Sequence, residues 1–252
     1  MRILVTNDDG IDAPGLSCLE TIAREISDDV WVVAPAPEQS AKGHSISLRD
    51  PVRLRGHGHQ RFSVDGTPAD CVMMGIRHVM ADGGVDLVLS GINSGANVAD
   101  DVTYSGTVAA AMEATLLGVP AIALSQEHRQ GEPIHWDTGR SHGTDVIRRA
   151  LAVGWPKGVL INVNFPPVAP GDVAGISPCR QGQHDFSLQK PQKRTDPFGR
   201  DYFWLAGWGL NVEEAPEGTD LHALLNNRIA VTPIHLDMTH DTTLERLAGA
   251  FA

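Results

Sequence analysis

The sequence has 252 residues, of which 42% are apolar and 20% are charged, as is ordinary for globular proteins. Acidic residues outnumber basic ones by 31 to 20, and the resulting net charge of −11 argues against a nucleic-acid duplex or an anionic membrane as the main partner. No apolar run is long enough to span a membrane, no signal-peptide pattern is visible, and three scattered cysteines form no disulfide framework, so we expect a cytoplasmic globular protein.

The N-terminal part of the chain alternates apolar runs with helical patterns. Residues 2–7 (RILVTN) predict a buried strand, and apolar residues recur at helical spacing after Pro14, which suits a first helical turn. Residues 30–34 (VWVVA) predict a second strand, because the run is apolar throughout and Pro35 ends it. A strand, a helix and a second strand therefore open the chain.

The same alternation continues through the middle of the chain. Residues 86–91 (DLVLSG) predict a third strand, and residues 106–118 predict a helix with a glycine near its C-terminal end. Further apolar strands are expected at 121–125 and 159–165, with a helix around 138–153 between them. Continuously apolar strands separated by helices are typical of βαβ units. We therefore expect an α/β protein with a mostly parallel sheet and helices on both faces.

The C-terminal third of the chain has a different character. Residues 178–210 are largely polar, are interrupted by prolines and contain the aromatic run YFW, which together predict an extended β-hairpin or arm. Residues 228–236 (RIAVTPIHL) predict a late strand. Neither an internal repeat nor an interdomain linker is visible. We therefore expect one domain over residues 1–252, with its core in about residues 1–170.

Two adjacent carboxylates, Asp8 and Asp9, follow the first predicted strand and precede a glycine. Such a pair is either a polar turn that ends a strand or a binding site for a cation. In open parallel sheets, ligands bind beyond the carboxyl ends of the strands. Ser40 follows the second predicted strand and Asn93 follows the third, so three polar clusters fall on one edge of the sheet. A strand-ending turn explains any one cluster but not the convergence of all three.

The chemistry of these four residues indicates a hard divalent cation. Carboxylate, hydroxyl and amide oxygens suit Mg²⁺ or Mn²⁺ better than zinc. Two ionised aspartates and one divalent ion sum to about zero charge, which relieves the repulsion between the carboxylates. We therefore predict one divalent metal ion per subunit, held by Asp8, Asp9, Ser40 and Asn93.

A second candidate site is the stretch YSGTVAAAMEA, where Ser105 and Thr107 flank Gly106 at the start of a helix of small residues. Unpaired amides and the positive end of a helix favour an anion there, and a glycine allows it to approach closely. The alternative is an ordinary serine or threonine N-cap. The sequence contains neither a GxxxxGK[ST] loop nor a GxGxxG motif, so a kinase, an NTPase or a dinucleotide dehydrogenase is unsupported.

Five stretches of the sequence resemble one known family, in that family's order. They are NDDGIDAPG, APEQSAKGHSISL, VDGTPADCV, LVLSGINSGANVADDVTYSGTVAAAMEA and GVPAIALS, and they cover most of residues 1–125. Together they resemble the SurE family, the survival-protein 5'-nucleotidases. One departure is Ala99, where the family pattern has a glycine.

The resemblance implies a Rossmann-like core and a metal-dependent phosphatase that hydrolyses nucleoside 5'-monophosphates to nucleosides and phosphate. Other phosphomonoesters or polyphosphate are further candidate substrates. By matching motif positions, it implies that the metal is held by Asp8, Asp9, Ser40 and Asn93, as predicted above. It places Asn97 and the Ser105-Gly106-Thr107 turn beside the phosphate. It also implies a homodimer or homotetramer formed through C-terminal arms such as residues 178–210.

The mechanism expected from these residues is attack of a water molecule on phosphorus, with Asn97, Ser105, Thr107 and helix amides around the phosphate oxygens. Either Asp8 or Asp9 could also deprotonate the water. A covalent route through Ser40 or Ser105 is disfavoured, because no base is assigned beside either serine. A haloacid-dehalogenase-type phosphatase needs a DxD pair, which residues 8–10 do not form. A nucleotide-binding sensor without turnover stays open as the alternative.

Overall fold

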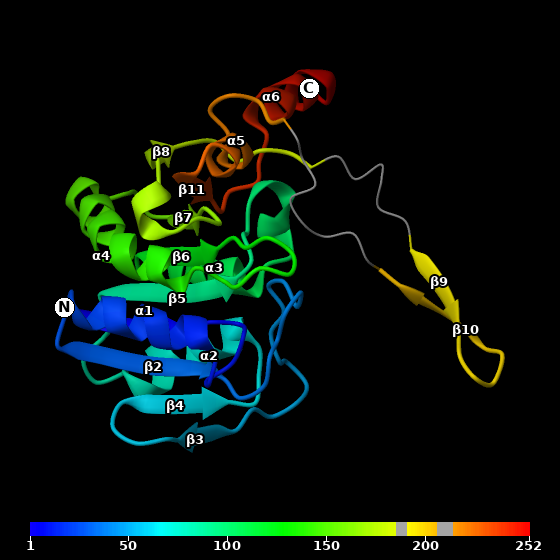
Figure 1. Ribbon diagram of the computed structural model, residues 1–252. Helices are drawn as coiled ribbons and strands as arrows, with labels where there is room; N and C mark the ends of the chain where they lie inside the picture. Colours follow the sequence, from blue (N-terminus) through cyan, green and yellow to red (C-terminus); the bar gives the residue numbers. More distant parts are fainter. Residues whose placement is uncertain (185–190, 206–213) are drawn as a thin grey trace.

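The computed structural model describes residues 1–184, 191–205 and 214–252. Its centre is a nine-stranded sheet in the order β3-β4-β2-β1-β5-β6-β7-β11-β8 (Figure 1). Strands β4, β2, β1, β5, β6 and β7 run parallel to one another, whereas β3, β11 and β8 run in the opposite direction. The strands are β1 (Arg2–Thr6), β2 (Asp29–Pro35), β3 (Leu54–Gly56), β4 (Arg61–Val64), β5 (Leu87–Ser94), β6 (Ala121–Gln126), β7 (Val159–Phe165), β8 (Gly175–Pro178) and β11 (Arg228–His235).

Helices cover both faces of this sheet, as the sequence predicts. Helices α1 (Pro14–Arg24) and α4 (Trp136–Val153) pack on one face, and α2 (Pro68–Met74) and α3 (Gly106–Leu116) pack on the other. Because successive side chains of a strand point to opposite faces, Ile3 and Val5 contact the α1–α4 layer while Leu4 contacts the α2–α3 layer. Burial on both faces explains why these strands are apolar throughout.

The longest predicted elements are present close to their predicted bounds. Pro14 is the first residue of α1, and Gly118 follows α3 with a φ of +83°, the left-handed conformation that commonly ends helices. The predicted strands correspond to β1, β2, β5, β6, β7 and β11, and the helix predicted around 138–153 is α4. The expected mostly parallel α/β architecture is confirmed.

Several short elements are not predicted from the sequence. Strands β3, β4 and β8 contain only three or four residues each, too few for a clear alternation of apolar and polar positions. Helix α2 begins with a capping box between Thr67 and Asp70, a local signal that its seven residues do not reinforce with a long periodic pattern. Two further short helices, α5 (Asp220–Leu225) and α6 (Asp241–Ala250), lie near the C-terminus, and no residue of α6 is buried.

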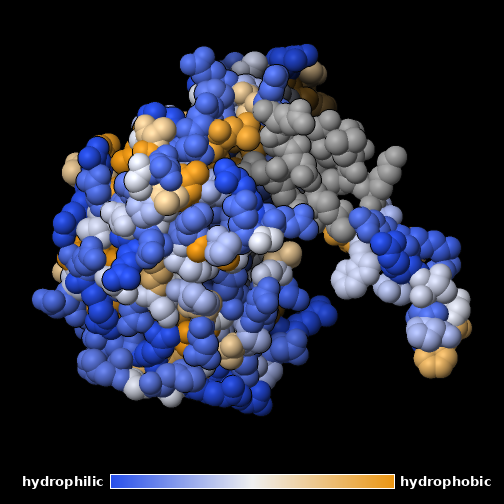
Figure 2. Space-filling model, in the orientation of Figure 1, coloured by the Kyte–Doolittle hydropathy of each residue, from blue (hydrophilic) through white to orange (hydrophobic). Residues whose placement is uncertain are grey.

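The predicted arm contains the antiparallel pair β9 (Gln192–Thr195) and β10 (Asp201–Trp204), which Figure 1 shows apart from the main sheet. The rest of the prediction for residues 178–210 falls partly on 185–190 and 206–210, which lie outside the described residues. Phe198, Phe203 and Trp204 are exposed, and Figure 2 shows an apolar tip on the hairpin. Among the described residues, no helix is both long and apolar enough to cross a bilayer.

Candidate active site

The turn after β1 places Asp8 and Asp9 at the carboxyl edge of the sheet. Gly10 adopts a φ of +104°, a conformation that residues other than glycine rarely adopt. The Asn7 side-chain Nδ2 atom donates to the Gly10 carbonyl at 2.9 Å. The Ile11 amide donates to the carbonyl of Pro35 at the end of β2, at 2.8 Å. The chain therefore turns sharply directly behind the two carboxylates, as the glycine in the sequence indicates.

Asp8 is buried against the N-terminus of α3. Its side chain accepts a hydrogen bond from the Thr107 hydroxyl, and a Cβ atom added to Gly106 would come within 2.8 Å of both the Asp8 Cβ and Oδ2 atoms. Only glycine therefore lets the helix approach this carboxylate so closely. Burial raises the pKa of Asp8 above its ordinary value, and the hydrogen bonds from Thr107 offset this in part.

Asp9 is half-buried beside the end of β5. Its Oδ2 atom accepts a hydrogen bond from the Ser94 amide at 3.2 Å. Burial, followed by the neighbouring charge of Asp8, raises the pKa of Asp9 to about 6. Asp8 and Asp9 form no ion pair with any Lys, Arg or His in the described parts of the chain. The two carboxylates are thus crowded, and no basic side chain among the described residues neutralises them.

Residues 36–47 form an exposed strap that leads from β2 across this edge and carries Ser40. The Gln39 amide donates to the Asp8 carbonyl at 2.8 Å, so the strap lies against the turn after β1. The Ser40 hydroxyl donates to Glu38 Oε1 at 2.8 Å, and the Glu38 charge contributes to the raised pKa of Asp8 and Asp9. Glu38 is therefore a third carboxylate at this edge.

A register shift in β5 brings Asn93 to the same edge. The pairing of β5 with β6 is regular up to Ser90 and resumes at Asn93, with an irregularity between them. The Asn93 Nδ2 atom donates to the Gly95 carbonyl at 2.8 Å, so the amide oxygen is directed away from that bond. Because Ser94 binds Asp9, the β5 end and the aspartate turn are in direct contact.

Asn97 lies in the loop after β5, with its backbone and side chain held by the sheet. Its amide donates to Asn164 Oδ1 at 2.7 Å, and its carbonyl accepts from Asn162 Nδ2 at 2.7 Å and from Asn164 Nδ2 at 3.2 Å. One hydrogen of its side-chain amide is donated to the Ser125 hydroxyl at 2.8 Å. Among the described residues, the second hydrogen of that amide has no acceptor, so it can be donated to a ligand.

Ser105 is the N-cap of α3, as the simpler interpretation of this turn predicts. Its oxygen accepts a hydrogen bond from the Val108 amide at 3.0 Å. The anion at this helix terminus is the carboxylate of Asp8, which Thr107 contacts. The structure therefore brings together the loops of Asp8 and Asp9, of Ser40, of Asn93 and of the α3 N-terminus, through the contacts given above.

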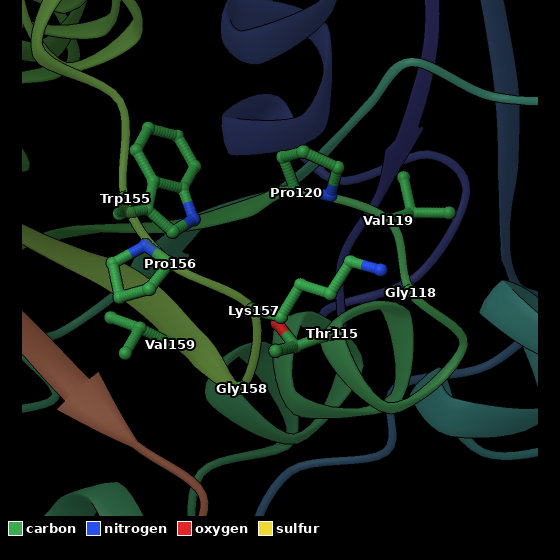
Figure 3. Close-up of a pocket in the computed structure, with 9 residues that line it drawn as sticks. All are labelled: Thr115, Gly118, Val119, Pro120, Trp155, Pro156, Lys157, Gly158 and Val159. Atoms are coloured by element: carbon green, nitrogen blue, oxygen red, sulfur yellow. The ribbon is translucent and has the colours of Figure 1, made fainter.

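Two hollows lie away from this edge. The first, of about 70 Å³, is at the amino ends of β6 and β7, and Figure 3 shows Lys157 reaching across it towards Gly118. It is too small for a nucleotide, since ligand pockets measure about 300–1,000 Å³. The second, of about 370 Å³, is an apolar groove beside α4 whose described lining carries one charge, that of Arg149. Neither hollow contains the oxygen-rich cluster at the carboxyl edge.

Comparison with known proteins assigns this arrangement to a family. The sequence matches the family described as Survival protein SurE over residues 3–188. The chain belongs to the SurE family. The crystal structure of the SurE protein from Aquifex aeolicus superposes with a TM-score of 0.85 at 36% identity, covering 100% of both chains. The resemblance inferred from the sequence motifs is thus confirmed along the whole chain.

Two relatives illustrate the level of similarity within the family. The 5'-nucleotidase SurE of Methylobacterium radiotolerans is 55% identical over 254 residues, with both chains covered completely. The 5'-nucleotidase SurE of Caulobacter vibrioides is 50% identical over 252 residues, which cover 99% of this chain and 95% of that one.

Some residues of this SurE-family site escape the sequence analysis. Glu38 is overlooked because only Ser40 of the strap is considered as a ligand. Asn162 and Asn164 are hidden inside the predicted strand VLINVNF, although two amides within an apolar run are a visible signal. Asp220 lies far away in the sequence, yet its carboxylate accepts a hydrogen bond from the Ala99 amide at 2.9 Å. No local spacing could have revealed that contact.

Proposed function

We propose that this chain hydrolyses nucleoside 5'-monophosphates to nucleosides and inorganic phosphate, with one Mn²⁺ or Mg²⁺ ion held by Asp8, Asp9, Ser40 and Asn93. The observation that carries the proposal is the uncompensated Asp8–Asp9 pair at the carboxyl end of β1, beside the N-terminus of α3. Full-length relatives at 55% identity bear the name 5'-nucleotidase SurE, which supports this activity.

The residues present fit a hard divalent cation. The raised pKa values of Asp8 and Asp9 indicate that their negative charges are poorly stabilised by the protein alone. The described residues contain no cluster of three or more His, Cys, Asp or Glu side chains with metal-binding geometry, so the proposed site relies on the Ser40 and Asn93 oxygens beside the two aspartates. Carboxylates supplemented by hydroxyl and amide oxygens are the donors that Mg²⁺ and Mn²⁺ prefer.

The surrounding groups suit a phosphomonoester. When bound, the cation would supply positive charge to a phosphate oxygen and acidify a water molecule. The Ser105 oxygen accepts from the Val108 amide, so its own hydrogen is directed elsewhere and can be donated to a phosphate oxygen. The Gly106 amide at the start of α3 and the second amide hydrogen of Asn97 offer further donors. Asp8 or Asp9 would accept the proton of the attacking water.

The test of this function is the release of phosphate from a panel of nucleoside 5'-monophosphates, measured with Mn²⁺, with Mg²⁺ and with chelator. Release that requires a divalent ion and stops on chelation supports the proposal and ranks bases and sugars at once. The matched control is a panel of nucleoside 3'-monophosphates under the same conditions. Tight nucleotide binding without release in any metal would instead favour the sensor that the sequence analysis keeps as its alternative.

Assembly is part of the same proposal. We infer that the chain forms a homodimer or homotetramer through its arm, because Phe198, Phe203 and Trp204 of the hairpin are 58–82% exposed. Apolar surface of this kind is typical of contacts between proteins. Light scattering coupled to gel filtration measures the assembly directly, and a variant with all three residues changed to serine should dissociate into smaller species. A monomeric wild-type chain would refute this part of the proposal.

A further inference from the structure

Strand β7 carries two asparagines in a position that requires explanation. Asn162 and Asn164 are completely buried, and β7 lies between β6 and β11 in the sheet (Figure 1). Asparagine is disfavoured inside strands, and a buried amide is costly unless its polar atoms are hydrogen-bonded. The cost is not fully offset here, because Asn162 Oδ1 has no hydrogen-bond partner among the described residues. Packing alone would therefore favour an apolar residue at this position.

Both side chains are directed at one residue of the loop after β5. Asn164 binds Asn97 at two points, since its Oδ1 accepts from the backbone amide at 2.7 Å and its Nδ2 donates to the carbonyl at 3.2 Å. Asn162 Nδ2 donates to the same carbonyl at 2.7 Å. Side chains of the strand thus replace the main-chain partners that a neighbouring strand would provide.

Fixing Asn97 also fixes the groups on either side of it in the chain. Asn93 lies four residues before it, in the register-shifted end of β5, and Ser105 lies eight residues after it, at the N-cap of α3. Between them the loop is held at Ala99 by Asp220. The loop therefore has a rigid attachment to the sheet midway between a proposed metal ligand and the proposed phosphate donors.

We propose that Asn162 and Asn164 are positioning residues for hydrolysis, which hold the loop of Asn97 in place where it leaves the end of β5 beside Asp9. This inference rests on the proposed function, since it assigns the pair a role in the same site. Burying two amides in the strand costs stability. That cost is consistent with a role in phosphoryl transfer, which depends mainly on placing charged and hydrogen-bonding groups accurately. The pair does not touch the substrate and acts through Asn97.

The decisive variants alter Asn164. Asn164→Leu keeps the branching and the number of heavy atoms of the side chain but loses both hydrogen bonds, so kcat should fall about 10- to 100-fold at saturating metal and nucleotide. Asn164→Asp keeps the acceptor for the Asn97 amide. When protonated, it can also donate to the carbonyl, so its activity relative to wild type should increase as the pH decreases. Because a buried carboxylate also destabilises the fold when it is ionised, melting temperatures over the same pH range must show that the variant stays folded throughout.

The matched control is Thr232→Val. Thr232 is a buried polar residue on β11, directly opposite Asn162 in the sheet register, and its hydroxyl contacts Cys179 and not the loop. This variant removes a buried polar group without touching the loop and should leave kcat within twofold. The proposal is overturned if Asn164→Leu also keeps kcat within twofold of wild type, or if Asn164→Asp is no more active than Asn164→Leu at any pH.

A separate measurement distinguishes failure of this proposal from failure of the proposed function. Hydrogen exchange of the Asn97 amide requires no substrate, and this amide is buried and bonded to Asn164 in the structure. Its protection should be lost in Asn164→Leu and retained in Asn164→Asp and Thr232→Val. If wild type releases no phosphate, the proposed function fails while exchange still reports on the attachment. Unchanged protection in Asn164→Leu refutes the attachment whatever the activity.

Discussion

Two regions of the candidate site are built on different principles. The first, which we call the floor, consists of Asp8, Thr107 and Asn97, which are at most 7% exposed. The second is the strap of residues 36–47, whose Ser40 is exposed. The hydrogen bonds that hold the floor are buried, whereas those that hold the strap are exposed or only partly buried. The rigid region can set geometry, and the exposed one can admit and release ligands.

The strap is attached to several other elements by individual hydrogen bonds. The Gly43 amide donates to the Tyr104 carbonyl at 3.1 Å, and His44 Nε2 lies 2.9 Å from Glu113 Oε2 on α3. At its far end, the amide and hydroxyl of Ser47 both donate to the Asp70 carboxylate, at 3.0 and 2.7 Å. Partly buried hydrogen bonds of this kind open more readily than core packing. Substitutions in the floor should therefore impair chemistry, and substitutions in the strap should impair ligand retention.

The largest contrast is expected between Asp8→Asn and Ser40→Ala. Asp8→Asn keeps an acceptor for Thr107 but removes a charge, so turnover should fall at least about 100-fold even at saturating Mn²⁺. Because burial disfavours the charged form of Asp8, the same variant should melt at a higher temperature than wild type in chelator. Ser40→Ala should mainly raise the Mn²⁺ concentration needed for half-maximal activity.

Steady-state kinetics over a range of Mn²⁺ concentrations, with melting curves in EDTA, measure these effects. Equal losses of turnover at saturating metal in Asp8→Asn and Ser40→Ala would abolish the distinction between floor and strap.

A smaller effect is expected from adding a methyl group to the floor. In Gly106→Ala the new Cβ would lie 2.8 Å from the Asp8 Cβ, so the carboxylate or the helix must shift. We expect a loss of about 1–3 kcal/mol of stability and a roughly tenfold lower kcat. Gly143→Ala is the control, because its Cβ meets the flexible end of the Ile22 side chain, also at 2.8 Å, and touches no site residue. Urea unfolding and kinetics compare the two, and an active, fully stable Gly106→Ala would contradict the close approach.

The stability of the metal-free protein should depend on pH, because the carboxylates of the site have raised pKa values. Between pH 3.8 and about 6, folded Asp9 retains a proton that the unfolded chain has lost. Stability should therefore decrease as the pH increases through this window and level off above it. Asp8, with its pKa also raised, acts in the same direction. Asp9→Asn should make this decrease shallower without abolishing it, because the pKa values of Asp101, Glu127 and Asp220 are raised as well. Glu132→Gln, at an exposed carboxylate outside the site, should leave the profile unchanged. Melting temperatures in EDTA at closely spaced pH values measure this, and an Asp9→Asn profile as steep as that of wild type would contradict the assignment.

The strand-ending residues show how far the sequence alone could lead. Asp8, Asp9, Ser40 and Asn93 are predictable because continuous apolar runs define the strands, and parallel strands put their carboxyl ends on one edge. The fold class follows from the same alternation. Their roles as metal ligands stay predictions, because the contacts described here place the loops together without testing what they bind.

The remaining contacts of the site join residues that are far apart in the sequence, so no local pattern can reveal them. Asn164 contacts Asn97 across 67 residues, and Asp220 contacts Ala99 across 121. Helix α2 and strands β3, β4 and β8 are too short for their periodicity to stand out. Tertiary structure, and not propensity, determines these elements.

Ala99 provides the smallest and most specific test of the floor. The family pattern has a glycine here, and Ala99 adopts a φ of +50°, which disfavours residues with a Cβ. Its methyl group is nevertheless buried among Val98, Leu221 and Leu224. Ala99→Gly relieves the backbone but loses roughly 0.8 kcal/mol of methyl burial, so the two effects should offset each other to within about 1 kcal/mol.

Ala99→Val should be far less tolerated, with a loss of about 2 kcal/mol or more, because a β-branched side chain is a poor fit to this conformation. Urea denaturation of both variants measures the difference. An Ala99→Val variant as stable as Ala99→Gly would show that the loop relaxes freely and that the attachment at Asp220 and Asn164 does not hold it. If only the glycine variant is tolerated, the rigid floor extends past Asn97 to Ala99. The backbone conformation of the loop then contributes to the floor together with the side chains.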